Sequence, residues 1–578
     1  MLPGLFRTWY FSSDEYVFAA EVIRFSHWDF RQHFFDIPGT PFMLLSAVLW
    51  SAIYTLAHAG RFVPTTGLEH FTFDHLSGLF ILMRSLTLIF FLASLVLTFL
   101  VASRLTNSVG GALAAVLLAT RPVYVQYSSF TRTESLAVCL FLVALLCVLG
   151  PGDMGGRRRA FAAGTLAGLA AAARLHSITA TIPLLLLFVL LWRPFGSPSR
   201  RIALAWAGAI GVILLIAAHI VSAAHIAPAS LGAMLLVFAG LAIVVAALAR
   251  VSPRARVFVR SLGASPSVLL LGGAVLGMGI GMPTIFTQWD HFVQSYVMYT
   301  TTYRDFDRAS LSFFEKIWWV FRFYIPVIAP ERTALLLLGI GAVAIVLGRD
   351  KRLVAVLVGA LSFFVARPLT LRAAPHHVIL WLPLFAIVMA YPIAWVWHCR
   401  SSTRPAVQRL SWVVGLVGMA FLGMLVNELL PTFTAVRRSV MSSEERLRNV
   451  AEASDWIGTH TRNDAVIAVA YYCFNAGVFY AWLRVLEVPV PAYVLDGREY
   501  VIWWGDRSTL AGKAGYAMAT PLDVASLKNR TDEVAPGEGT DPFTEPRFTP
   551  LARFGADGAT VTVFRFGPES APALPASH

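Results

Sequence analysis

Charged residues are scarce in this 578-residue chain: they make up 14% of it, whereas hydrophobic residues make up 57%. Ordinary soluble domains carry roughly 25% charged residues, so the composition excludes a soluble globular enzyme and a disordered chain. The four cysteines are too few and too scattered to predict a disulfide framework. No signal peptide or hydrophobic span precedes Asp14, so we expect one further transmembrane helix upstream of Met1. The composition predicts a polytopic membrane protein.

Several enzyme motifs are also missing. No glycine-rich phosphate loop stands between a strand and a helix, because Gly272, Gly273 and the glycines of 277–281 fall within an apolar run. Small residues at such places usually serve helix packing in the membrane. No HExxH zinc motif occurs either. These absences disfavour a nucleotide-sugar donor and a histidine-based zinc site.

The net charge of +13 gathers in short loops between apolar runs. Such basic loops face the cytoplasm, so we expect this charge to orient the chain and not to bind nucleic acid. About twelve apolar runs are long enough, or nearly so, to cross the hydrocarbon layer. These expected spans are 79–103, 109–123, 135–150, 160–175, 177–192, 202–222, 230–249, 266–283, 333–348, 353–367, 377–397 and 410–430.

The basic loops also predict which side each segment faces. If loop 157–159 is cytoplasmic, every later basic loop falls on the same side, and residues 431–578 fall outside. Arg104 then lies inside, so residues 1–78 lie outside. A crossing by the apolar run Pro41–Gly60 would break this parity, so we expect an interfacial or re-entrant helix there. A true crossing is the alternative that its length allows.

The C-terminal part has a different character. Residues 444–461 have helical spacing, 464–470 form an apolar run typical of a buried strand, and 560–566 alternate as a half-buried strand does. About 145 residues suffice for one modest core. We therefore expect an all-α polytopic membrane bundle with external amphipathic helices and a small extracytoplasmic α/β domain. The expected parts are an external segment 1–78, a transmembrane core 79–430 and the α/β domain 431–578.

Two adjacent carboxylates, Asp14 and Glu15, open an amphipathic stretch near the N-terminus. Ser12 and Glu15 have the spacing of a capping box, and acidic residues suit a helix N-terminus, so a structural role explains them. Two carboxylates at the outer membrane surface would also deprotonate or orient a hydroxyl nucleophile. The residues alone leave both interpretations open.

The stretch 14–41 resembles the first external loop of GT-C membrane glycosyltransferases. It holds an acidic pair, an amphipathic helix, a Trp-Asp-Phe turn at 28–30 and a proline, Pro41, that opens an apolar helix. Protein O-mannosyltransferases and bacterial lipid A aminoarabinose transferases are the members it is most similar to. The resemblance continues at Arg84, Arg104, 127–136 and 375–383.

The chain departs from that family's pattern in three respects. Glu134 stands where the family more often has Asp, Pro38 is displaced from the usual proline pair, and no inserted sugar-binding module occurs. The resemblance still implies about thirteen spans, a lipid-linked sugar donor, inverting transfer and an external active site. The subfamily stays open.

The resemblance implies that Asp14 is the catalytic base and that Glu15 or Glu134 supports it or positions the acceptor. Transfer from a lipid phosphate also needs cationic or hydrogen-bonding groups near the leaving phosphate, a role that arginine and protonated histidine suit. The candidate substrate-binding residues are Arg84, Arg132, Arg174, His176, Arg304, Arg372 and His376.

Each candidate also has a simpler interpretation. Outer-surface cations extend to lipid headgroups, and Glu134 would form an ion pair with nearby Arg132. Arg84 is harder to explain in this way, because an unpaired arginine within an apolar run is costly. We therefore predict an acidic partner for it in the N-terminal loop. A divalent cation held by Asp14, Glu15 and Glu134 is a further option, and the metal question stays open.

The sequence thus predicts an inverting glycosyltransferase of the bacterial inner (plasma) membrane. It would move a sugar from a polyprenyl-phosphate carrier to an unidentified hydroxyl or phosphate acceptor on the extracytoplasmic face. The alternative is a polytopic lipid or glycan transporter or flippase. That class often shows internal repeats and broken helices near the midplane, whereas here no repeat is seen and the acidic residues gather outside the spans. A non-catalytic scaffold is a third option.

Overall fold

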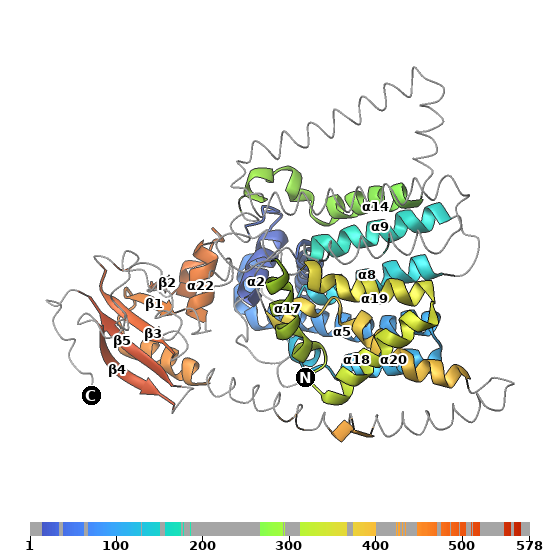
Figure 1. Ribbon diagram of the computed structural model, residues 1–578. Helices are drawn as coiled ribbons and strands as arrows, with labels where there is room; N and C mark the ends of the chain where they lie inside the picture. The colour runs from blue at the N-terminus through green and yellow to red at the C-terminus, as the bar shows by residue number, and fades with distance from the viewer. Residues whose placement is uncertain are drawn as a thin grey trace, which may run out of the picture.

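The structure is a computed structural model that describes most, but not all, of the chain. The described residues are 14–33, 39–62, 67–128, 130–150, 156–174, 266–292, 313–366, 374–399, 448–470, 476–485, 487–495, 497–503, 513–520, 548–555 and 560–567, with isolated residues between these ranges. They form a bundle of apolar helices and a separate five-stranded sheet (Figure 1).

The bundle helices lie side by side and share one apolar core (Figure 1). They form because each is a long apolar run that satisfies its own backbone hydrogen bonds. They are α5 (Leu76–Leu105), α6 (Ser108–Ala119), α8 (Glu134–Leu149), α9 (Gly156–Ala173), α14 (Pro266–Gly281), α18 (Arg332–Gly348), α19 (Lys351–Ala366) and α20 (Leu382–Cys399). Short helices α7 (Pro122–Tyr127), η2 (Pro283–Phe286) and η4 (Pro375–Val378) cap or connect them.

These helices coincide with eight of the expected spans, which are therefore helical as predicted. The other four expected spans, 177–192, 202–222, 230–249 and 410–430, lie wholly or mostly outside the described residues. By length and hydropathy, two described helices are able to cross a membrane, α5 and α3 (Thr40–Ala59). The segment 314–328 with 332–348, bent by 116°, would make a third. The interfacial position expected for α3 stays a prediction.

One helix of this region was not expected. None of the expected spans covers α17 (Phe313–Ile328), which lies between the expected spans 266–283 and 333–348 and packs near η4. Its charged residues Glu315, Lys316 and Arg322 interrupt the apolar run, so the sequence pattern alone does not predict this helix as a span. The helix ends just before the sharp bend into α18.

Helices α9 and α14 approach so closely that their backbones touch. A Cβ added at Gly164 or Gly168 of α9 would lie 1.9 and 2.0 Å from carbonyl oxygens of α14. Reciprocally, a Cβ at Gly273 or Gly277 of α14 would lie 2.3 and 2.0 Å from oxygens of α9. The prediction that glycines of this run serve helix packing is confirmed for these two, whereas Gly272 faces open space.

The C-terminal domain is a mixed sheet with strand order β2-β1-β3-β5-β4. Strand β1 pairs in parallel with β2 and with the central strand β3, and β5 pairs antiparallel with β3 and β4. The strands are β1 (Val466–Ala470), β2 (Glu499–Trp503), β3 (Gly515–Ala519), β4 (Phe548–Phe554) and β5 (Val561–Phe566). A helix over 448–460 precedes β1, and α22 (Ala476–Val485) and α23 (Ala492–Leu495) follow it. The helix and both strands predicted from the sequence are present.

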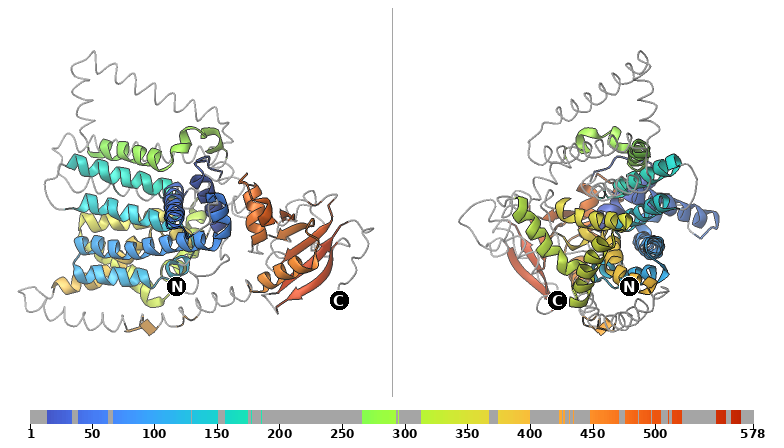
Figure 2. Two further views of the ribbon diagram at one scale, coloured as in Figure 1. Left: turned by 180° about the vertical axis from the view of Figure 1, so that it is seen from behind. Right: turned by 45° about the vertical axis from the view of Figure 1, so that its right-hand side comes forward.

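The N-terminal helices lie between the bundle and the C-terminal domain (Figures 1 and 2). Helix α2 (Asp14–Ser26) is buried along almost its whole length, and α4 (Leu68–Asp74) leads into α5. One apolar cluster joins residues of α2, α3 and α5 to residues of the sheet domain. The N-terminus of α2 is therefore enclosed at the end of the bundle, where three parts of the chain meet.

Candidate functional site

The centre of the candidate site is a buried ion pair between α2 and α5. Arg84 donates from Nε to Glu15 Oε1 and from Nη2 to Glu15 Oε2, both at 3.0 Å, and both side chains are inaccessible to solvent. The backbone N–H of Thr131 donates a third hydrogen bond, 2.6 Å long, to Glu15 Oε1. The predicted acidic partner of Arg84 is thus present in the N-terminal loop.

These contacts decide the charge of Glu15. Burial raises the pKa of this carboxyl, but the Arg84 guanidinium and the Thr131 N–H outweigh burial and hold its pKa below the ordinary value. Glu15 is therefore an ionised anchor with donors on both oxygens. Asp14, the first residue of α2, stands next to it in the sequence; its side chain lies outside the described residues.

The segment 131–134, just before and at the start of α8, carries the next two candidates. The Arg132 N–H donates to Thr87 Oγ1 at 3.1 Å, which fixes this segment against α5. Glu134 begins α8, where a carboxylate is favoured by the helix dipole. Its partner is Arg174 at the end of α9, at 3.2 Å from Nη2 to Oε1. The alternative pairing of Glu134 with Arg132 is not what the structure shows.

The Glu134–Arg174 pair has unused hydrogen-bonding capacity. Glu134 is 1% exposed and Arg174 is 5% exposed. Apart from their single ion-pair contact, both oxygens of Glu134 and the Nε and Nη1 of Arg174 have no hydrogen-bond partner among the described residues. A buried polar group left unsatisfied costs about 1–3 kcal/mol, so such a concentration calls for an explanation. A bound polar ligand would supply the missing partners.

Two further candidates meet at an aromatic ring. The Arg132 guanidinium lies 4.8 Å from the ring centre of Tyr127. The His376 ring, from η4, lies 5.2 Å from the same ring. The ring of its neighbour His377 lies edge-on to that of His376, with ring centres 4.5 Å apart, and its Nδ1 is 3.5 Å from the hydroxyl of Tyr324. The structure therefore brings Arg132 and His376 together at Tyr127.

Six of the ten predicted site residues are thus placed at one end of the bundle, around α2, α5, α8 and η4. The remaining candidates lie outside the described residues. They are His176, Arg304, Arg372 and the side chain of Asp14.

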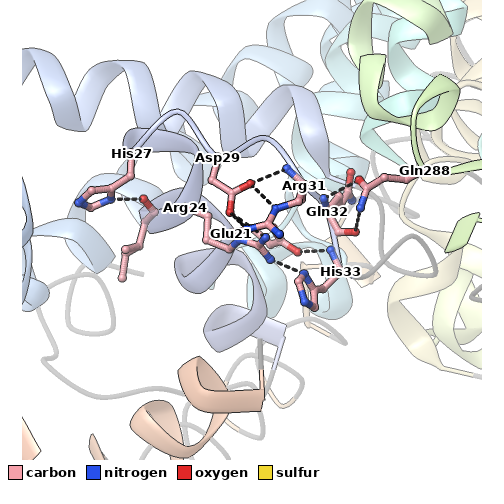
Figure 3. A network of polar contacts seen from close by, with 9 residues as sticks. Glu21, Arg24, His27, Asp29, Arg31, Gln32, His33 and Gln288 are labelled. Carbon is pink, nitrogen blue, oxygen red and sulfur yellow. Dashed lines mark hydrogen bonds and ion pairs between the residues drawn. The ribbon is translucent and has the colours of Figure 1, made fainter. Parts of the chain in front are cut away.

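A polar network after α2 was missed by the sequence reasoning (Figure 3). Glu21 accepts a 2.8 Å hydrogen bond from the His33 N–H, and Arg24 donates to Asp29 at 3.0 Å and contacts His33 Nδ1. The Gln32 N–H donates to the side chain of Gln288 at 2.9 Å. The network folds loop 27–33 back onto α2 and ties it to the segment after η2. Its only sequence signal is the alternation of acids and bases over 21–36.

Two of these groups have shifted pKa values. Burial, reinforced by Arg24, lowers the pKa of His33 to about 4. Hydrogen bonds from Arg31, followed by those from Arg24, hold the pKa of Asp29 well below its usual range, although burial opposes them. Asp29 is therefore ionised and His33 neutral near pH 7.

A third buried ion pair was not anticipated from the sequence. Arg121 Nη1, just before α7, lies 2.7 Å from Glu331 Oε2, just before α18. Arg121 also donates to the carbonyls of Leu117 and Ile328. This pair fastens two helix ends of the bundle together and touches none of the candidates above in the described contacts.

No group of three or more His, Cys, Asp or Glu side chains within the described parts of the chain is placed to hold a metal ion. The two described candidate carboxylates each face an arginine. The divalent cation thus stays an expectation from the sequence. The arrangement itself supplies ionised carboxylates, fixed guanidiniums and an aromatic surface within one buried region.

No protein-family model and no curated protein sequence matches this chain significantly. Among solved structures, the chain is similar to ArnT from Cupriavidus metallidurans in the apo state, with 12% identity, a TM-score of 0.42, and coverage of 98% of this chain and 97% of that one. A crystal structure of the same ArnT bound to undecaprenyl phosphate gives 12% identity, a TM-score of 0.41 and coverage of 98% of both chains. The oligosaccharyltransferase of Archaeoglobus fulgidus in the apo form gives 12% identity, a TM-score of 0.45, and coverage of 98% and 72%. Likenesses this distant carry no functional argument, so the function proposed below rests on the residues of this chain.

Proposed function

We propose that this protein is an inverting glycosyltransferase that takes a sugar from a polyprenyl-phosphate carrier. The observation that carries the proposal is the buried Glu134–Arg174 pair: apart from one ion-pair contact, both oxygens of Glu134 and the Nε and Nη1 of Arg174 have no hydrogen-bond partner within the described part of the chain. Glu134 belongs to the segment 131–134, whose Thr131 N–H also donates a hydrogen bond to Glu15. A carboxylate beside a guanidinium offers an acceptor for a hydroxyl proton and a donor for a phosphate oxygen within one enclosed place.

The reaction needs few groups. The acceptor oxygen attacks the anomeric carbon from the face opposite the phosphate, and a new C–O bond forms. The bond between that carbon and the phosphate oxygen breaks, and its electron pair leaves with the polyprenyl phosphate. The hydroxyl proton passes to a carboxylate. Cationic donors stabilise the charge that develops on the leaving phosphate.

The environments of the carboxylates divide these roles. Three hydrogen bonds occupy Glu15, and its pKa is below the ordinary value, so its carboxylate has little tendency to accept a proton. We therefore assign it a structural role and not that of the base. Asp14, its neighbour at the start of α2, is the proposed base, in keeping with the resemblance noted above. Glu134 is proposed to orient the acceptor. Arg174 and Arg132 are proposed to receive the phosphate.

The proposed location follows from the basic loops. Their parity supports a position of the start of α2 and the segment 131–134 on the extracytoplasmic side, which we propose to be that of a bacterial inner membrane. A polyprenyl carrier keeps its chain in the lipid and its phosphate at headgroup depth. Charged residues at the ends of apolar helices meet that depth without a large desolvation cost. The acceptor would approach from outside, the side on which the same parity predicts the C-terminal domain.

The test is transfer of a radiolabelled sugar from a polyprenyl-phosphate donor in proteoliposomes. We expect Asp14→Asn to lower the rate by about 10²–10⁴-fold, as loss of a general base does. Glu134→Gln should lower it by about 10²-fold, because the acceptor is then poorly oriented. Glu452→Gln is the matched control, because this carboxylate is exposed on the helix 448–460, away from the site. It should transfer at the wild-type rate.

Wild-type rates in both Asp14→Asn and Glu134→Gln would overturn the proposal. The transporter alternative makes a different prediction for the same vesicles. Movement of labelled lipid-linked sugar across the bilayer, unaffected by Asp14→Asn and without any transfer product, would favour that class.

A further inference from the structure

The C-terminal domain reaches the candidate site through one aromatic side chain. Phe479 of α22 is completely buried. Its ring stacks on Tyr16 with centroids 5.8 Å apart and meets Phe80 nearly edge-on at 5.8 Å. Tyr16 belongs to α2 and Phe80 to α5, so one residue of the external domain contacts both helices that carry the central ion pair.

Both contacts are next to that pair. Tyr16 directly follows Glu15 in the first turn of α2. Phe80 lies four residues before Arg84, on the same face of α5, and the Arg84 guanidinium carbon is 5.9 Å from the Phe80 ring centre. Phe479 therefore packs between α2 and α5, next to the residues that form the Glu15–Arg84 hydrogen bonds.

We propose that Phe479 is a positioning residue of the active site. Its ring sets how closely the first turn of α2 approaches α5, and so where Glu15 and the preceding Asp14 stand. Aromatic contacts of this kind have preferred geometries, and a close-packed neighbourhood transmits a displacement because it has little room to absorb one. The external domain is then a component of the site and not an appendage to it.

A second docking contact of the same domain provides an internal control. Tyr493 of α23 donates a 3.2 Å hydrogen bond to Asp74 and stacks on His70 at 5.1 Å. It is 51% exposed and binds α4, at the edge of the interface. No described contact connects it to Glu15 or Arg84. Tyr493→Phe removes a docking hydrogen bond and leaves the packing around the ion pair untouched.

The experiment compares Phe479→Ala, Phe479→Leu and Tyr493→Phe in the full-length protein. The first readout, amide hydrogen exchange, needs no activity. Phe479→Ala should speed exchange of the first turns of α2 by about tenfold, because loss of packing promotes local opening. The strands β1 and β5 should exchange as in the wild type, which shows that the domain is still folded. Phe479→Leu should give a smaller change, and Tyr493→Phe none in α2.

The second readout is kinetic and rests on the proposed function. In Phe479→Ala, kcat for sugar transfer should fall by about a hundredfold, since a small misplacement of a reacting group has an effect of that size. The KM for the donor should change by less than about threefold. In a Glu15→Gln background, where the ion pair is already lost, Phe479→Ala should add little further loss. Phe479→Leu should restore much of the rate.

The two readouts separate the possible failures. Unchanged exchange in α2, or losses from Glu15→Gln and Phe479→Ala that simply multiply, would overturn the role of Phe479. A wild-type protein that transfers no sugar would refute the proposed function, and the exchange result would still decide whether Phe479 positions α2.

Discussion

Two buried acid–arginine pairs stand at the same end of this molecule and differ in how completely they are satisfied. Glu15 and Arg84 share two hydrogen bonds, and a backbone N–H adds a third. Glu134 and Arg174 share one contact of 3.2 Å, and most of their remaining polar atoms have no described partner. A buried ion pair contributes to stability only when its geometry is good and its other donors and acceptors are occupied. The first pair meets that condition, whereas the second has capacity left for a ligand.

The largest effect on stability should come from breaking the fully hydrogen-bonded Glu15–Arg84 pair. Arg84→Met leaves Glu15 buried with no cation, so we expect the free energy of unfolding to fall by about 3–5 kcal/mol. Denaturant or thermal unfolding of the detergent-solubilised protein measures this change. Glu15→Gln combined with Arg84→Met should be less damaging than Arg84→Met alone, because no charge is then left uncompensated. An equal loss of unfolding free energy in the single and double variants would show that the ion pair does not hold α2 against α5.

The under-satisfied pair should behave in the opposite way. Replacing both partners, Glu134→Gln with Arg174→Met, should change the free energy of unfolding by no more than about 1 kcal/mol, since removal of a poorly paired ion pair is often neutral or stabilising. Sugar transfer should nevertheless be lost. Unfolding and transfer measured on the same preparation test both parts. A double variant that unfolds as readily as Arg84→Met would remove the distinction between the pairs.

The smallest effect concerns the loop network around His33. The folded-state pKa of His33 is about 4, below the ordinary value near 6.5. The unfolded chain therefore binds the proton more readily, and stability falls as the pH drops from about 6.5 to about 4. Because the ring is only half-buried, we expect a loss of about 1 kcal/mol across this window.

His33→Gln should flatten that dependence, and unfolding at pH 7.5 and pH 5 of the wild type and variant measures it. Asp29 contributes little between these two pH values, because its carboxyl is mostly ionised at pH 5 even in the unfolded chain and its pKa is lower still in the folded one. If His33→Gln and the wild type lose equal stability between the two pH values, another group controls the acid side.

The sequence predicts the parts of this molecule that depend on local pattern. Long apolar runs such as 79–103 and 135–150 became α5 and α8 within a few residues, because a helix within lipid needs only length and hydrophobicity. Alternation and apolar content likewise located β1 and β5. The partner of Arg84 was predictable in kind, since a buried guanidinium requires an acid.

The remaining features depend on tertiary packing and leave no local signal. Glu134 pairs with Arg174 of the next helix and not with Arg132, two residues away, because the start of α8 faces the end of α9. The Arg121–Glu331 pair joins residues more than two hundred positions apart. The contact of Phe479 with Tyr16 and Phe80 requires the docking of a whole domain. Spacing along the chain contains none of this information.

The glycine contacts between α9 and α14 have a consequence for how a lipid substrate would enter. Where backbones touch at Gly164, Gly168, Gly273 and Gly277, no side chain is present that could swing aside. This seam cannot serve as a lateral gate for a prenyl tail, and it prevents α9 from rotating about its axis. Arg174, at the end of α9, is consequently fixed in its orientation about the axis of α9. Any portal from the bilayer must open along a different helix boundary.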